Sequence, residues 1–186
     1  QYEVLSGRMP QSWNEVVLIL DKDNRITDYT LYALGVLDLK PVQDALSEKL
    51  NGGDAEIDTT VHTYAYSDFL GMTFKLLPGS SFYSETDGIW SDRSADTLYM
   101  TAALENAEDL TIVGVVRPQE DSASGSTFGV IGYSSDLMTH LMEQVNGSAV
   151  VRAQQEAPDT DILTGLPFAD PDAEPVVYTM EEIEAM

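Results

Sequence analysis

The chain contains no cysteine, and this absence removes several kinds of site at once. Without thiols there is no disulfide framework, no thiolate zinc site and no cysteine nucleophile. Long apolar runs are also missing, since no stretch approaches the roughly 20 residues that an α-helix needs to cross a bilayer. No N-terminal series of basic, apolar and small residues is typical of a signal peptide. We therefore expect this segment to be soluble.

Basic residues are scarce, because 9 Lys and Arg stand against 32 Asp and Glu and leave a net charge of −23. Such a surface repels phosphate backbones and anionic lipid headgroups, so binding to nucleic acid or to a membrane surface is disfavoured. Hydrophobic residues still make up 43% of the chain, which argues against disorder. At 186 residues, the chain is expected to form one domain around a single core.

Short apolar stretches separated by Gly and Pro predict a mixture of strands and helices. Strands are expected at residues 16–20, 55–66, 74–77, 110–116 and 130–133. Helices are expected at residues 28–37, 41–50, 96–106, 135–146 and 148–157. A loop or irregular hairpin with a half-buried Trp90 is expected at 78–95, and a flexible loop at 119–127.

The order of these elements shows no regular βαβ rhythm. We therefore predict an α+β fold, with a mixed or antiparallel sheet and several short helices packed around one core. Thr27 or Asp28 can cap the first helix, and Ser134 or Ser135 can cap the helix at 135–146. Residues 1–168 are assigned to one domain. Residues 169–186 have too many prolines and carboxylates for a core, so they are expected to be an acidic tail or the start of another segment.

Acidic clusters are the first candidates for chemistry, since paired carboxylates bind cations or exchange protons. Asp21, Asp23 and Asn24 begin like a calcium loop. Ile26 and Tyr32 stand where that loop needs Gly and Glu. The segment is therefore predicted to be a solvated turn.

Other catalytic or metal-binding patterns also fail. The acidic triplets at 159–161 and 170–172 are too short for the roughly six to eight oxygen ligands that calcium prefers. His62 and His140 show no H-E-x-x-H spacing, so structural roles are favoured for both. The stretch GYSSD at 132–136 lacks the closing Gly of a nucleophile elbow, and no phosphate-binding loop is present. We assign no catalytic, cofactor or metal site and expect the chain not to be an enzyme.

The stretch LSGRMPQSWNEVVL begins with a Gly-Arg-x-Pro turn and continues directly into a buried strand. It resembles the signature of the extracytoplasmic domain of MacB-like and FtsX-like ABC transporter permeases. The match is carried by Gly7, Arg8, Pro10, Glu15, Val16, Val17 and Leu18. In physical terms, the Gly allows an unusual backbone, the Pro stiffens the turn, and the Glu can flank the strand.

Later segments extend this resemblance over about residues 2–168. YTLYALGVLD resembles the family's short helix after the first strand, and LTIVGVVRP resembles a later strand with Val113, Gly114 and Val115 at its centre. GYSSDLMTHLMEQVN and TGLPF are similar to versions in large permeases of Gram-positive gut bacteria. The order of the motifs is more specific than any one of them.

The resemblance implies a non-catalytic domain at the extracellular face of the cell membrane. Its partners would be the membrane helices of the permease and, through them, an ATP-binding subunit. An extracellular protein or peptide would be a further ligand. The implied role is to couple ATP-driven motion to export, lipoprotein handling, peptide resistance or cell-envelope regulation.

Other interpretations remain open at this stage. The Gly-Arg-x-Pro stretch is also compatible with a generic strand start. A free-standing secreted or lipid-anchored module would bind a peptide or glycan in an aromatic groove. Its candidate residues are Tyr64, Tyr66, Phe82, Tyr83 and Trp90. An acid hydrolase would need a carboxylate pair, and the sequence nominates none.

Overall fold

A mixed five-stranded sheet organises the computed structural model, which describes residues 2–55, 60–119 and 130–169. The strands are β1 (Tyr2–Gly7), β2 (Glu15–Ile19), β3 (Thr73–Leu76), β6 (Glu108–Pro118) and β7 (Val130–Tyr133). β6 is central, with β2 parallel to it along one edge and β7 antiparallel beyond β2. β1 and β3 pair antiparallel with the other edge of β6. The predicted α+β fold with a mixed sheet is confirmed.

β1 and β3 lie end to end along the same edge of β6. Gly7 at the end of β1 lies opposite Gly114, whereas Thr73 at the start of β3 lies opposite Thr111. Just before β3, the Gly71 N–H donates to the Ile112 carbonyl over 2.9 Å and continues the pairing. The long β6 therefore joins two segments that are distant in sequence.

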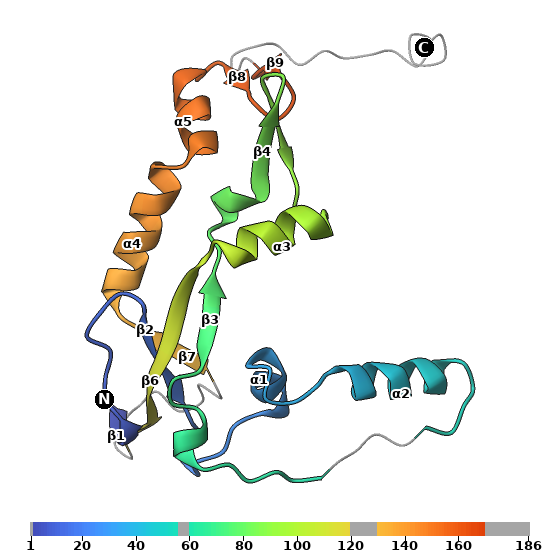
Figure 1. The fold of residues 1–186 in the computed structure, drawn as a ribbon, viewed down its shortest axis with the longest axis vertical. Coiled ribbons are helices and arrows are strands. Elements are labelled where there is room, and N and C mark those ends of the chain that lie inside the picture. Colours follow the sequence, from blue (N-terminus) through green and yellow to red (C-terminus); the bar gives the residue numbers. More distant parts are fainter. Residues whose placement is uncertain (1, 56–59, 120–129, 170–186) are drawn as a thin grey trace, which may run out of the picture.

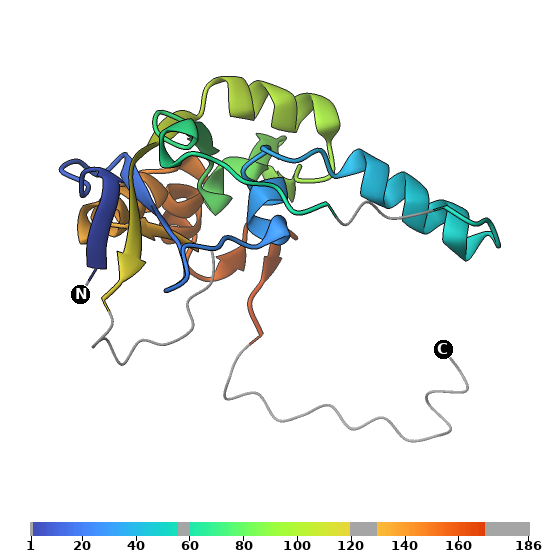
Figure 2. The ribbon, with the colours of Figure 1, turned by 90° about the horizontal axis from the view of Figure 1, so that it is seen from below.

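Helices surround the sheet and extend from it (Figures 1 and 2). They are α1 (Asp28–Ala33), α2 (Lys40–Leu50), α3 (Thr97–Glu105), α4 (Ser135–Asn146), α5 (Ala149–Glu156) and the 3-10 helices η1 (Tyr66–Asp68) and η2 (Gly79–Phe82). α1 packs on the core, whereas α2 buries no residue and projects from the body in both views. Pro41 lies in the first turn of α2, where a helix tolerates proline because its missing N–H would have no partner there.

The core lies on both faces of β2, whose apolar run continues without polar interruption. On one face, Val16 and Leu18 pack with residues of β6, α1 and the segment after η1, namely Ile112, Val115, Leu31, Leu34 and Phe69. On the other face, Val17 and Ile19 pack with Val116. A run of this kind is typical of a strand that is buried on both faces.

The distal end of the molecule, opposite the sheet along its longest axis, contains a second group of elements (Figure 1). It consists of the hairpin β4 (Tyr83–Thr86) and β5 (Ile89–Asp92), the helix α5, and the short pair β8 (Thr160–Asp161) and β9 (Leu166–Pro167). The Trp90 N–H donates to the Ile162 carbonyl over 3.0 Å and joins the hairpin to the loop between β8 and β9. α4 runs from the sheet towards this distal end, where α5 follows it.

The strand predicted at residues 55–66 is not present in the described part of this stretch. Residues 60–65 are irregular and η1 follows them, while residues 56–59 lie outside the described residues. The alternation of apolar and polar residues did indicate which side chains are buried, because Tyr64 and Tyr66 pack against the core. A strand also needs a hydrogen-bonding neighbour, and no described strand pairs with this segment. The prediction was wrong for that reason.

The stretch at 78–95 is more regular than expected, since it forms η2 and the β4–β5 hairpin. Asp87 and Gly88 at its turn both have positive φ, at 52° and 83°, which is the backbone that an Asp-Gly hairpin turn requires. Trp90 is half buried, as predicted. Most of the predicted loop at 119–127 and residues 170–186 of the tail lie outside the described residues.

Candidate functional site

The Gly-Arg-x-Pro turn between β1 and β2 is closed by an ion pair. Arg8 donates through Nη1 to Oε2 of Glu15 over 2.6 Å, and through Nη2 to Oε1 over 2.5 Å. The Gln11 N–H donates to the same carboxylate over 2.8 Å. This bidentate contact joins the first and last parts of the turn.

Glu15 is held in its charged form by these donors. The Arg8 guanidinium, and next the Gln11 N–H, lower the pKa of Glu15 to about 2. The same hydrogen bond raises the pKa of Arg8. A carboxylate with so low a pKa is a poor general base at neutral pH, so the geometry favours a structural role for this pair.

The turn begins where the backbones of β1 and β6 approach each other closely. Gly7 has a φ of 73°, and a Cβ atom on it would collide with the Val113 carbonyl oxygen. A Cβ on Gly114 would collide with the Arg8 carbonyl oxygen. The Arg8 N–H donates to the Val113 carbonyl over 2.9 Å. Glycine is therefore required at both positions for the two backbones to meet.

The same turn carries an anchor cluster, which we define as Trp13, Glu108, His140 and Gln144. The Trp13 ring stacks on the His140 ring, with centroids 3.6 Å apart and an interplanar angle of 15°. His140 Nε2 lies 2.7 Å from Oε2 of Glu108, and Gln144 Nε2 donates to the same oxygen over 2.6 Å. The anchor cluster thus fastens α4 to the start of β6 and to the Gly-Arg-x-Pro turn.

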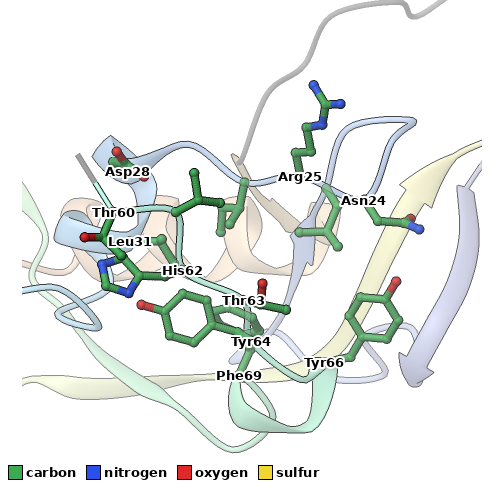
Figure 3. A pocket seen from close by; sticks show the side chains of 13 residues that line it. Asn24, Arg25, Asp28, Leu31, Thr60, His62, Thr63, Tyr64, Tyr66 and Phe69 are labelled. Carbon is green, nitrogen blue, oxygen red and sulfur yellow. The ribbon is translucent and has the colours of Figure 1, made fainter.

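A hollow of about 410 Å³ opens between α1, the loop before it and the segment at 60–66 (Figure 3). Leu31 and Phe69 on its apolar side are only 3% exposed. Tyr64 and Tyr66 are half buried, and the centroids of the Tyr64 and Phe69 rings lie 5.8 Å apart. We call this site the aromatic hollow.

Polar side chains surround the mouth of the aromatic hollow. Arg25 extends away from the rings and Asp28 stands at the start of α1 (Figure 3). His62 and Thr63 come from the opposite, irregular segment. A concave site with an apolar floor and a few polar groups at its rim is typical of ligand binding.

The aromatic residues nominated from the sequence do not form one groove. Tyr64 and Tyr66 line the aromatic hollow, whereas Phe82, Tyr83 and Trp90 belong to η2 and the hairpin at the distal end. The Tyr99 hydroxyl of α3 donates to the Tyr83 carbonyl over 3.0 Å and helps to hold this second group.

Asp21 and His140 take structural places, whereas His62 lies at the rim of the aromatic hollow. Asp21 Oδ1 accepts from the N–H groups of Asp23 and Arg25, so the stretch that begins like a calcium loop is a hydrogen-bonded turn. His62 and His140 do not meet, because one borders the aromatic hollow and the other stacks on Trp13. Among the described residues, no group of three or more His, Asp or Glu side chains is placed to hold a metal ion.

Comparison with protein-family models, curated proteins and solved structures finds no match to this chain. Within the described ranges, none of the helices has the length and apolar character needed to cross a bilayer.

Sequence reasoning selected Arg8 and Glu15 but did not predict that they pair. Opposite charges at the two ends of a short turn were the available signal. The contact between Trp13 and His140 had no such signal, because it depends on where α4 lies relative to the turn. The aromatic hollow was found in part, since Tyr64 and Tyr66 were nominated without the α1 side of the site.

Proposed function

We propose that this chain is a non-catalytic extracytoplasmic domain of a MacB-like or FtsX-like ABC transporter permease from a Gram-positive bacterium. It would couple ATP-driven motion of the membrane helices to export, peptide resistance or cell-envelope regulation. One observation carries the proposal: two of the segments that resemble the family, around Gly7 and around Gly114, are hydrogen-bonded neighbours. The two motifs lie far apart in sequence but side by side in the fold. This arrangement supports the proposal that they belong to one structural unit of the family.

The arrangement of the molecule supports a mechanical role. The sheet and the distal end lie at opposite ends of its longest axis, and α4 runs between them (Figure 1). The stacked Trp13 and His140 rings fasten α4 at the sheet. Coupling between distant sites needs elements that both sites can bias, and a helix anchored at one end is suited to this role.

The proposed partners follow from this role. The remaining permease would supply the membrane helices and, through them, contact with an ATP-binding subunit. The domain would stand at the extracellular face, where an extracellular protein or peptide would contact it. Its net charge of −23 disfavours adhesion to anionic lipid and to nucleic acid.

The test compares the intact permease with a variant that lacks residues 2–168. After reconstitution with the ATP-binding subunit, we expect assembly and basal ATP hydrolysis to persist, while the response to the extracellular ligand or partner is lost. A growth or resistance assay in the native host checks the same variant. Loss of assembly would make the segment a structural part, and unchanged resistance would make it dispensable; either result overturns the coupling role.

A second candidate is a free-standing secreted or lipid-anchored binding module. The aromatic hollow favours it, because a ligand site needs no membrane helices to act. The surrounding reading frame separates the two candidates. Membrane helices encoded on both sides of this segment support the permease, whereas a lipobox before it and a stop codon soon after it support the module.

A further inference from the structure

The aromatic hollow is bordered by a strip of backbone with free hydrogen-bonding groups. The N–H and C=O groups of residues 61–64 take part in no hydrogen bond within the described parts of the chain. Backbone hydrogen bonding resumes at Ala65, the residue before η1. Its N–H donates to Asp68 Oδ2, and its carbonyl accepts from the Asp68 N–H. Residues 61–64 are not part of a sheet, but their unpaired donors and acceptors can pair with an extended peptide as those of an exposed strand edge do.

The hollow next to this strip is shaped for an apolar side chain. Its floor contains the buried Leu20, Leu31 and Phe69, and its walls contain Tyr64 and Tyr66. Tyr64 belongs to the strip that offers the free backbone groups, and Tyr66 follows it at the start of η1 (Figure 3). A bound strand would therefore find backbone partners and an apolar pocket side by side, which is the combination used in strand-addition sites.

Charge selects among the peptides that fit. Arg25 and Asp28 oppose each other in sign at the rim, so the immediate site has no strong preference. The chain as a whole carries a net charge of −23, which attracts cations and repels anions over long range. A cationic peptide would approach this surface faster than an anionic one.

We propose that the aromatic hollow binds an extended, net cationic peptide. The peptide backbone pairs with residues 61–64, and one bulky apolar side chain enters the hollow between Tyr64, Tyr66 and Phe69. The proposal does not depend on the permease context, since every group that it uses lies in this chain. Binding to the isolated chain therefore tests it separately from the coupling role.

The probes are fluorescent peptides that alternate lysine and threonine around one central position, which is varied over all amino acids. Fluorescence anisotropy with the full 186-residue chain measures each dissociation constant. We expect a central Phe, Leu or Trp to bind about tenfold more tightly than a central Ala, since burial of a large apolar side chain supplies a difference of this size. Replacement of the lysines by glutamates weakens binding, and added salt reduces that difference.

A backbone test separates strand pairing from apolar adhesion. Alternate amides of an extended peptide face opposite edges, so N-methylation of one set removes the donors to residues 61–64, whereas methylation of the other set leaves them. We expect the two methylated central-Phe peptides to differ about tenfold or more in affinity. Equal affinities would overturn the pairing that we propose.

Protein variants locate the site. Tyr66→Ala should weaken the central-Phe peptide about tenfold, whereas Tyr133→Ala, at a 56% exposed ring on β7, should not change its affinity. Thr63→Trp fills the hollow from an exposed position and should block binding without removing core atoms, which decides the question if Tyr66→Ala fails to fold. The proposal is overturned if no peptide binds, if the central residue has no influence, or if only a chito-oligosaccharide binds in a Tyr66-dependent manner.

Discussion

Gly7 and Gly114 lie opposite each other in β1 and β6, so close that neither position has room for a side chain. We predict that Gly114→Ala lowers the free energy of unfolding by about 1–3 kcal/mol, the usual cost of inserting an atom into well-packed structure. The reason is that its Cβ would meet the Arg8 carbonyl, which is backbone and cannot rotate away. Denaturant unfolding followed by tryptophan fluorescence measures the change.

Gly79→Ala is the matched control. No atom lies within 4 Å of the position that its Cβ would take, and Gly79 has no positive φ. The control variant should stay within about 0.5 kcal/mol of the wild type, as is usual for surface substitutions. Similar losses for the two variants would contradict the close approach of β1 and β6.

The Arg8–Glu15 ion pair predicts a specific dependence of stability on pH. The folded-state pKa of Glu15, about 2, lies below its ordinary value of 4.5, so the ion pair stabilises the fold above 4.5. This contribution is lost as the pH falls from 4.5 towards 2. Glu15→Gln should therefore be less stable than the wild type at neutral pH, and the difference should shrink over that range. Denaturant unfolding at several pH values measures it.

NMR titration provides a direct check on the same pair. The Glu15 carboxyl should titrate near 2 in the wild type and closer to 4.5 in Arg8→Gln, because the main donor is gone. Asp44→Asn is the control for the stability of Glu15→Gln. The Lys40–Asp44 pair is mostly exposed, and because such pairs add little stability, this variant should unfold like the wild type. A Glu15 titration that Arg8→Gln leaves unchanged would rule out the bidentate contact as the cause.

The elements that the sequence predicted best are those whose type and ends follow from the local sequence pattern alone. The run at residues 16–20 has no polar position and is too short for a typical helix, so it favours a strand that is buried on both faces. The helix at 135–146 was predicted with its observed bounds, because Ser134 and Gly147 mark its ends. In both cases the local sequence carries enough information without knowledge of the neighbours.

β1 was not predicted, and its position in the sheet explains why. Its side chains are largely exposed, with Tyr2 and Val4 about 40% accessible, so burial leaves little pattern in the sequence. The strand exists because its backbone pairs with β6, and pairing of this kind is not encoded locally. The segment at 60–65 shows the converse, since it has the alternation of a strand but no described strand beside it.

Only part of the aromatic hollow could be predicted from the sequence. Tyr64 and Tyr66 were visible as aromatic residues on one short segment, whereas Leu31 joins them only because α1 packs on the core. An irregular hairpin was one of the two expectations for 78–95, and the Asp87-Gly88 signal that fixes its turn was also present in the sequence. Contacts between distant elements account for the parts that could not be predicted.

The stacking of Trp13 on His140 predicts a measurable coupling between the Gly-Arg-x-Pro turn and α4. In a double-mutant cycle with Trp13→Ala and His140→Ala, we expect a coupling free energy of about 0.5–1.5 kcal/mol, the range found for aromatic pairs. Thermal or denaturant unfolding of the four proteins provides the values. The cycle of Trp90→Ala with His140→Ala is the control, because Trp90 lies at the distal end and the two effects should add.

The residues before α1 and α4 predict different changes in stability when their side-chain hydroxyl group is removed. Thr27 Oγ1 accepts from the Thr30 N–H over 3.2 Å and caps α1, so Thr27→Ala should lower the free energy of unfolding by about 1 kcal/mol. Ser134 occupies the same position before α4, but its Oγ is buried without a hydrogen-bond partner among the described residues. Ser134→Ala should therefore stay within about 0.5 kcal/mol of the wild type or stabilise the protein, because no bond is lost and a buried polar atom is removed. Denaturant unfolding of the two variants measures both values. A loss at Ser134 as large as that at Thr27 would mean that the Ser134 hydroxyl does cap α4 in solution.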